Sequence, residues 1–155
     1  MKTKRTFNMI KIIGTATIVT VMALSIGCAS VDKAPATADS AAKQFKSNPN
    51  YAQVYVYRDE ILGSALRMDV AVNGKPAGET ASKSYFKFDL PAGTHTFTSQ
   101  GDDEPVKLQT RNGGIYYLWQ EMKMSMLAPK SDLQVVEDTV GKKGVLASTM
   151  IQSKL

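Results

Sequence analysis

The stretch Gln53-Val54-Tyr55-Val56-Tyr57-Arg58 decides the fold class, because its side chains alternate with a period of two. The two valines share one face and the two tyrosines share the other, so we expect a strand that is apolar on both sides. From Asn50 onward the same period continues through most of the chain. The sequence therefore predicts a mainly β domain.

Alternating segments of this kind recur downstream and are separated by turn signals. We expect strands over residues 53–58, 67–72, 75–80, 85–90, 94–99, 106–110, 115–121 and 133–137. Asn73-Gly74 and Asn112-Gly113 supply the pairs that tight hairpins favour, and Pro91-Ala92-Gly93 makes another turn. This regular spacing predicts an antiparallel sandwich or barrel of seven or eight short strands over residues 51–137.

The last residues, 138–155, change from strand periodicity to helical intervals. The residues at these intervals are Val140, Gly144, Ala147 and Ile151. They predict a short C-terminal helix followed by a tail. Gly141 and Gly144 are expected to weaken that helix by ~1 kcal/mol each relative to alanine.

Residues 28–50 have the composition of a flexible tether. They are rich in Ala, Ser, Asp, Lys and Pro, and Phe45 is their only aromatic residue. Such a segment buries too little apolar surface to fold alone. Asp39 is an N-cap candidate followed by helix formers, and Asn48-Pro49 supplies a stop, so we expect a short helix within the tether.

Residues 1–27 have the organisation of a signal peptide. Four cations stand in the first eleven residues, and no charge occurs from Ile12 to Ile26. This apolar run is shorter than the ~20 residues that a membrane-spanning helix needs. Export is therefore the expected fate of the chain.

Gly27-Cys28, at the end of the apolar run, resembles the lipobox of bacterial lipoproteins. The resemblance implies cleavage before Cys28 and attachment of a diacylglyceryl group and a further fatty acyl chain such as palmitate to that residue. Ser25 departs from the family pattern, which usually has leucine there. An uncleaved signal anchor or a buried apolar cysteine is the alternative reading.

Lipidation would make the membrane a partner through the anchor at Cys28. In similar Gram-negative lipoproteins an aspartate just after the cysteine favours the inner membrane, and Ala29-Ser30 stands here instead. The expected location is therefore the cell envelope, at the outer membrane and facing the periplasm.

Removal of residues 1–27 would take away most of the net positive charge. The whole chain has 19 basic and 14 acidic residues and a formal charge of +5, but four of the basic residues lie in the signal region. The remaining 15 cations are scattered among 14 anions, which does not favour nucleic-acid binding. The single cysteine also excludes an internal disulfide.

Short motifs over residues 50–140 resemble a bacterial domain family of unknown function. They are Tyr55-Val56-Tyr57-Arg58, Asn73-Gly74-Lys75 with Gly78, Tyr85-Phe86, Pro91-Ala92-Gly93-Thr94-His95 and Tyr116-Tyr117. These are turn and core signatures rather than catalytic ones. Members are typically small lipoproteins of proteobacterial envelopes, so the resemblance implies a compact β-sandwich, similar to immunoglobulin-like and transthyretin-like modules, with no established activity.

His95 is the only histidine, so a Ser-His-Asp triad would have to be built through it. The sequence contains no Gly-x-Ser-x-Gly motif to supply the nucleophile. Phe97 follows two residues later, which favours a partly buried strand position for His95. No catalytic set can be nominated, and we expect no enzymatic activity.

Metal sites have two candidate stretches. The first is an alternating row of thioethers, Met122, Met124 and Met126, which suits Cu(I) but equally suits the filling of apolar space. The second is an acidic run, Asp102, Asp103 and Glu104, which lacks the spacing of a calcium loop and favours a solvated turn. No cofactor is expected.

Aromatic side chains would form a binding platform if several shared an exposed face. The candidates are Tyr51, Tyr55, Tyr57, Tyr85, Tyr116, Tyr117 and Trp119, of which we expect most to pack in the core. The sequence thus favours a non-enzymatic envelope lipoprotein that binds another envelope protein or a cell-wall component, through a sheet edge or exposed tyrosines. The alternative is a periplasmic lipoprotein that binds a small ligand or Cu(I).

Overall fold

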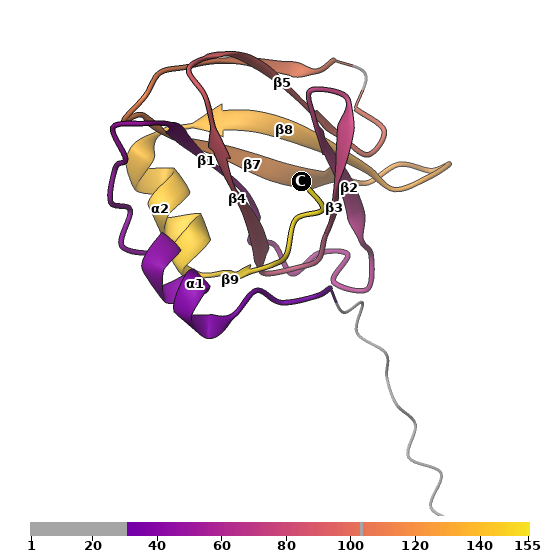
Figure 1. Cartoon of the computed structure of the whole chain (residues 1–155). Coiled ribbons are helices and arrows are strands. Elements are labelled where there is room, and N and C mark those ends of the chain that lie inside the picture. The colour runs from indigo at the N-terminus through magenta and orange to yellow at the C-terminus, as the bar shows by residue number, and fades with distance from the viewer. Residues whose placement is uncertain (1–30, 103) are drawn as a thin grey trace, which may run out of the picture.

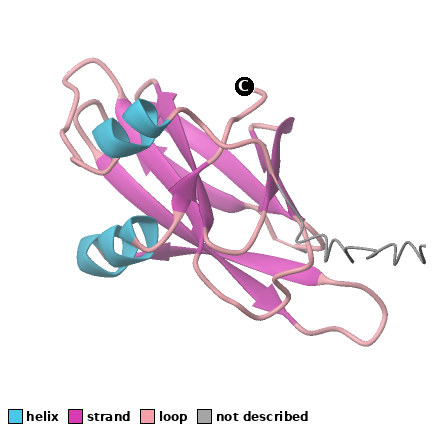
Figure 2. Ribbon diagram, turned by 90° about the horizontal axis from the view of Figure 1, so that it is seen from below, coloured by secondary structure: helices cyan, strands magenta, loops and turns pink. Residues whose placement is uncertain are grey.

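Two β-sheets face one another across an apolar core, and two helices cover the outer face of the larger sheet (Figures 1 and 2). The computed structural model describes residues 31–102 and 104–155. The expected signal peptide and Cys28 lie outside the described residues. Neither helix in the described ranges is long and apolar enough to cross a membrane.

The five-stranded sheet contains, in spatial order, β8 (Lys130–Val136), β7 (Ile115–Lys123), β1 (Ala52–Arg58), β4 (Ser84–Leu90) and β9 (Thr149–Met150). The four-stranded sheet contains β3 (Lys75–Thr80), β2 (Met68–Val72), β5 (Gly93–Ser99) and β6 (Val106–Thr110). The helices are α1 (Ala36–Ala42) and α2 (Asp138–Leu146). The predicted mainly β sandwich is confirmed, and β1 to β8 keep the predicted positions to within a few residues. β9 was not predicted, because residues 138–155 were expected to form a helix and a tail.

Two strand pairs are parallel, which corrects the expectation of a wholly antiparallel sandwich. β1 pairs with β7 in parallel, with Tyr57 opposite Trp119, and β4 pairs with β9 in parallel. β1 lies at the centre of the larger sheet and is buried along its whole length, so it needs a neighbour on each side. A neighbour that arrives after a long excursion through the other sheet is free to run in either direction.

Both faces of β1 are buried, as the alternation predicts. Val54 and Val56 point into the core between the sheets, where Phe86 and Phe97 are also buried. The tyrosine face points to the helices and forms a second core. Its buried members are Ala42, Tyr55, Tyr57, Tyr85, Tyr117 and Val145. The molecule therefore has three layers, and the larger sheet is the middle one.

Helix α2 packs closely on this tyrosine face because two of its residues have no side chain. A Cβ at Gly144 would lie 2.0 Å from Tyr57 Cε2, and a Cβ at Gly141 would lie 2.1 Å from Tyr117 Cγ. The glycines that weaken the helix on propensity grounds thus permit its approach to the sheet. The helix ends at Leu146, and the chain then returns to the sheet as β9.

Residues 31–50 lie against the sandwich, which differs from the flexible tether expected over residues 28–50. Helix α1 begins after Pro35 rather than at Asp39. Phe45 packs on Tyr55 with ring centroids 5.6 Å apart. The Ala34 N–H donates to the Met150 carbonyl at 3.0 Å. The segment is ordered because the tyrosine face supplies the apolar surface that the segment itself lacks.

The Asp39 carboxylate holds α1 to the sheet. It accepts hydrogen bonds from Lys43 Nζ at 2.8 Å, the Met150 N–H at 2.8 Å and the Tyr85 hydroxyl at 2.9 Å. Burial would raise the pKa of Asp39, but these three donors together hold that pKa below its ordinary value of 3.8. The ionised form therefore contributes to folding stability.

Replacing Asp39 by asparagine is expected to lower the free energy of unfolding by about 1–2 kcal/mol at pH 7, because charge-assisted hydrogen bonds are lost. The wild-type contribution is complete above the unfolded pKa near 3.8 and is lost as the pH falls through the lowered folded pKa. The difference between wild type and variant, measured by urea denaturation from pH 7 to pH 3, should shrink below about pH 4. A difference that stays constant over this range would contradict the assignment.

Candidate docking surface

Two uncharged loops leave the sandwich at the same end. Residues 61–66 (Ile-Leu-Gly-Ser-Ala-Leu) follow β1, and residues 124–129 (Met-Ser-Met-Leu-Ala-Pro) follow β7. Because β1 and β7 are parallel neighbours, their carboxyl ends lie side by side. Leu66 and residues 122–129 line one hollow of about 200 Å³ between the loops.

Large apolar side chains on these loops point into solvent. With their exposed fractions they are Ile61 (75%), Leu62 (57%), Met124 (78%), Met126 (103%) and Leu127 (98%). We call these five residues the apolar end. Clustered exposure of this kind marks an interaction site more often than scattered surface leucines do.

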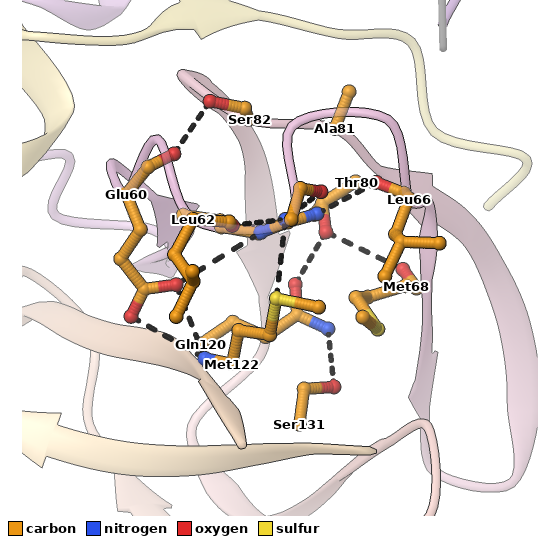
Figure 3. A network of polar contacts seen from close by, with 12 residues as sticks. Glu60, Leu62, Leu66, Met68, Thr80, Ala81, Ser82, Gln120, Met122 and Ser131 are labelled. Atoms are coloured by element: carbon orange, nitrogen blue, oxygen red, sulfur yellow. Dashed lines mark hydrogen bonds and ion pairs between the residues drawn. The ribbon is translucent and has the colours of Figure 1, made fainter. Parts of the chain in front are cut away.

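A buried arginine fixes the first loop. Arg58, at the end of β1, is completely buried, and its Nη1 donates to the Leu66 carbonyl at 2.8 Å. Its Nη2 donates to the carbonyls of Gly63 at 2.7 Å and Leu62 at 3.1 Å. Figure 3 shows Leu62, Leu66 and Met122 converging on this point. The loop is thus wrapped around the guanidinium group.

Met122 also contacts the guanidinium group of Arg58. Its Sδ lies 3.8 Å from Arg58 Nη2. Gly63 has a φ of +63°, and a Cβ on it would lie 2.2 Å from the same sulfur. Only glycine therefore satisfies both the turn and the close approach of the loop to β7.

Glu60 fastens the start of the loop to β7. Its carboxylate accepts from the Met122 N–H, with Oε2 at 3.1 Å, and Oε2 lies 4.0 Å from Arg58 Nε. Burial raises the pKa of Glu60 despite these two partners. Burial also disfavours the charged form of Arg58 and so lowers its pKa, although guanidinium groups stay charged in proteins. Among the described residues Arg58 Nε has no hydrogen-bond partner.

A second polar network joins the two sheets beneath the loops. Gln120 is completely buried, and its Oε1 accepts from the Thr80 hydroxyl at 2.5 Å. Its Nε2 donates to Ser131 Oγ at 3.1 Å (Figure 3). The same nitrogen donates to Ser99 Oγ at 2.8 Å. Since Thr80 and Ser99 belong to one sheet and Gln120 and Ser131 to the other, the network ties the sheets together at this end.

The methionine row predicted from the sequence is divided by the structure. Met122 is a buried strand residue in contact with Arg58, whereas Met124 and Met126 are exposed on the following loop. All three line the same hollow. Within residues 31–102 and 104–155 there is no cluster of three or more His, Cys, Asp or Glu side chains that would hold a metal ion.

His95 lies in a strand, as predicted, and is buried rather than partly buried. It is buried in β5, and both ring nitrogens are occupied. Nε2 donates to the Pro91 carbonyl at 2.9 Å, and Nδ1 accepts from Asn73 Nδ2 at 2.9 Å. In the acidic run the Glu104 N–H donates to Asp102 Oδ1 at 3.2 Å, which is a turn contact, and Asp103 lies outside the described residues.

The aromatic side chains do not form an exposed platform. Tyr55, Tyr57, Tyr85 and Tyr117 are buried beneath the helices, and Tyr51, Tyr116 and Trp119 are partly buried. The Tyr55 hydroxyl donates to the Ala42 carbonyl at 2.8 Å. Burial raises the pKa of Tyr57 to about 12 and raises the pKa values of the other three buried tyrosines as well. These rings join the helices to the sheet.

Neither the apolar end nor the burial of Arg58 is predicted by the sequence pattern. One available signal is that residues 61–66 and 124–129 both lack charge and both follow a predicted strand. Their proximity depends on the parallel pairing of β1 and β7, which side-chain alternation does not reveal.

Comparison with known proteins shows that the apolar end lies inside a recognised domain. The model of a family described as "Protein of unknown function (DUF2846)" matches residues 48–132. This range contains both loops, Arg58 and Gln120. A protein of Haemophilus influenzae described as "Uncharacterized protein" is 29% identical over 141 residues, covering 89% of this chain and 84% of that protein. No solved structure matches this chain.

Proposed function

The chain belongs to the family of proteins of unknown function DUF2846, and we propose that it is a lipid-anchored protein of the cell envelope with a non-enzymatic docking module. In this proposal Cys28 carries the lipid, the sandwich is held at the outer membrane facing the periplasm, and the apolar end binds another component of the envelope.

The sequence before the described residues supports the anchor. A cationic start, an uncharged apolar run over residues 12–26 and the Gly27-Cys28 pair form the pattern of a lipoprotein signal. Ala29-Ser30, in place of an aspartate, favours the outer membrane.

The observation that carries the docking role is the apolar end itself. Five large apolar side chains are exposed, and Arg58 holds the loop that carries two of them, Ile61 and Leu62, in place. Loops that are already ordered lose less conformational entropy when they bind a partner. Burial of such side chains on binding contributes roughly 1.5–3 kcal/mol for each one that becomes fully covered.

Replacing Cys28 by alanine is expected to abolish labelling with radioactive palmitate and to leave a precursor that still carries residues 1–27. The measurement is metabolic labelling followed by mass determination of the purified chain. Asn112→Ala, in an exposed turn, is the control and should be processed and labelled like the wild type. Normal labelling of the Cys28 variant would end the lipoprotein proposal.

The docking role is tested with a photo-crosslinking residue at Leu127 in living cells. We expect reproducible adducts with an envelope component from this position. The same residue at Asn112, in the turn before β7 and so at the opposite end of the strand, should give none. Equal yields from the two positions would remove the apolar end as a docking surface.

Cu(I) binding is the second candidate, favoured by the three methionines that line one hollow. The double variant Met124→Leu with Met126→Leu separates the two functions, because it keeps the apolar surface and removes two sulfurs. Docking predicts unchanged crosslinks from Leu127. Copper binding predicts that Cu(I) raises the Tm of the wild type and no longer raises that of the variant.

A further inference from the structure

We infer that the apolar end lies in the surface of the phospholipid bilayer that holds the lipid anchor. This inference rests on the proposed lipidation of Cys28, and it names the partner of the docking surface. The sandwich would then touch the membrane at two neighbouring places, through the acyl chains and through its two uncharged loops.

The described chain begins beside the first of these loops. Val31 and Asp32 line the same surface hollow as Arg67, and Arg67 directly follows Leu66. Figure 1 shows the start of the described chain, in indigo, next to the loop that leads into β2. The entry point of the chain and the apolar end therefore belong to the same end of the sandwich.

The distance from that entry point to the anchor is short. Cys28 precedes Val31 by three residues, and three extended residues span at most ~11 Å. The headgroup region on each side of a bilayer is roughly 5–8 Å thick. A sandwich tied to acyl chains by so short a connection must keep this end close to the membrane surface.

The loops have the composition of a surface that enters a bilayer interface. Residues 61–66 and 124–129 contain no charged side chain. Lys123 and Lys130 border the second loop and are exposed. Lysines that border an apolar surface can lay their methylene stems on it, and the ammonium group of Lys123 pairs with Glu121.

Within residues 31–102 and 104–155, the other exposed apolar side chains do not form a comparable surface. Val135 lies on β8, Val140 and Leu146 lie on α2, and Leu155 is the last residue. They are separated on different elements, whereas the apolar end gathers its five residues on two adjacent loops. The Glu60 carboxylate, which directly precedes the first loop, is turned inward to the Met122 N–H.

The test uses the mature, lipidated protein in vesicles of phosphatidylethanolamine and phosphatidylglycerol. Acylation consumes the only cysteine thiol, so Leu127→Cys introduces a single reactive thiol for a nitroxide label. Asn112→Cys provides the matched control at the opposite end of β7. We expect a water-soluble paramagnetic chelate to reach the Leu127 label about threefold less than the Asn112 label, as for side chains buried in a membrane interface.

Each result decides the question. Equal access to the two labels, in protein that floats with the vesicles, would overturn the inference and leave the lipid anchor standing. Protein that carries no lipid and does not float would overturn the proposed function and the inference with it. A Leu127 label that is shielded in cells but not in vesicles would show that a protein covers the apolar end, which would also overturn the inference.

Discussion

Replacing Gly144 by alanine is expected to destabilise the protein by about 3 kcal/mol, although alanine is the better helix former by about 1 kcal/mol. The added Cβ would lie 2.0 Å from Tyr57 Cε2 and 2.5 Å from Tyr57 Cδ2. Tyr57 cannot yield, because it belongs to the central strand β1 and is 2% exposed. The helix must therefore move away from the sheet and lose its packing on the tyrosine face.

Val140→Ala is the matched control for this change. Val140 lies on the same helix with its side chain half exposed, so the substitution should alter the free energy of unfolding by less than about 0.5 kcal/mol. Urea denaturation followed by circular dichroism gives both values. If Gly144→Ala proved as stable as the wild type, the close packing of α2 on Tyr57 would be wrong.

Replacing Arg58 by methionine is expected to lower the free energy of unfolding by about 3 kcal/mol and to release residues 61–66. The carbonyls of Leu62, Gly63 and Leu66 would lose their donors, and Glu60 would lose its positive neighbour. Arg58→Lys should also destabilise, because one ammonium group does not reproduce the fork that reaches three carbonyls. Limited chymotrypsin digestion should cut residues 61–66 faster in the Arg58→Met variant than in the wild type.

Arg67→Met serves as the control. Arg67 has an exposed side chain, and its contact with Glu79 at 3.4 Å is a surface ion pair, so the change should amount to less than about 1 kcal/mol. If the Arg58 variant kept both wild-type stability and a protected loop, Arg58 would not be what orders residues 61–66.

Local pattern was sufficient to predict β1 to β8, whereas β9 lies in the segment that was predicted as a helix and tail. Alternating side chains placed β6 at its observed bounds and β1 within one residue. Asn73-Gly74 forms the expected turn with positive φ at both residues, +52° and +75°. These features depend on neighbouring residues in the sequence, and the sequence displays them directly.

Features that depend on distant partners were not predictable in this way. The parallel pairing of β1 with β7 leaves no local signature, because side chains alternate identically in either direction. From the sequence, Gly141 and Gly144 are expected only to weaken the helix. Their role in close packing becomes clear only from their contacts with Tyr117 and Tyr57. Asp39 was predicted to be a helix cap, because its hydrogen-bond partners Tyr85 and Met150 lie far along the chain and the local sequence does not reveal them.

The candidate site was hidden from the sequence for a related reason. An arginine at the end of a strand is normally solvated, and the complete burial of Arg58 follows only from the loop that folds over it. The methionine row was visible, but a row that begins in a strand and continues in a loop does not keep one face. The aromatic residues were also visible, and their burial depends on the two helices that cover them.

The beginning and the end of the described chain are hydrogen-bonded to one another. Lys33 and Ile151 form an isolated antiparallel β-bridge, and the Gln152 N–H donates to the Asp32 carbonyl at 2.9 Å. During synthesis, residues 32 and 33 can therefore form these bonds only after residues 151 and 152 have been made. Likewise, β1 can pair with β7 only after the strands between them in the sequence have been made. A fold dominated by such distant contacts closes late and slowly. The larger sheet of the sandwich would thus be completed only after β9 has been made.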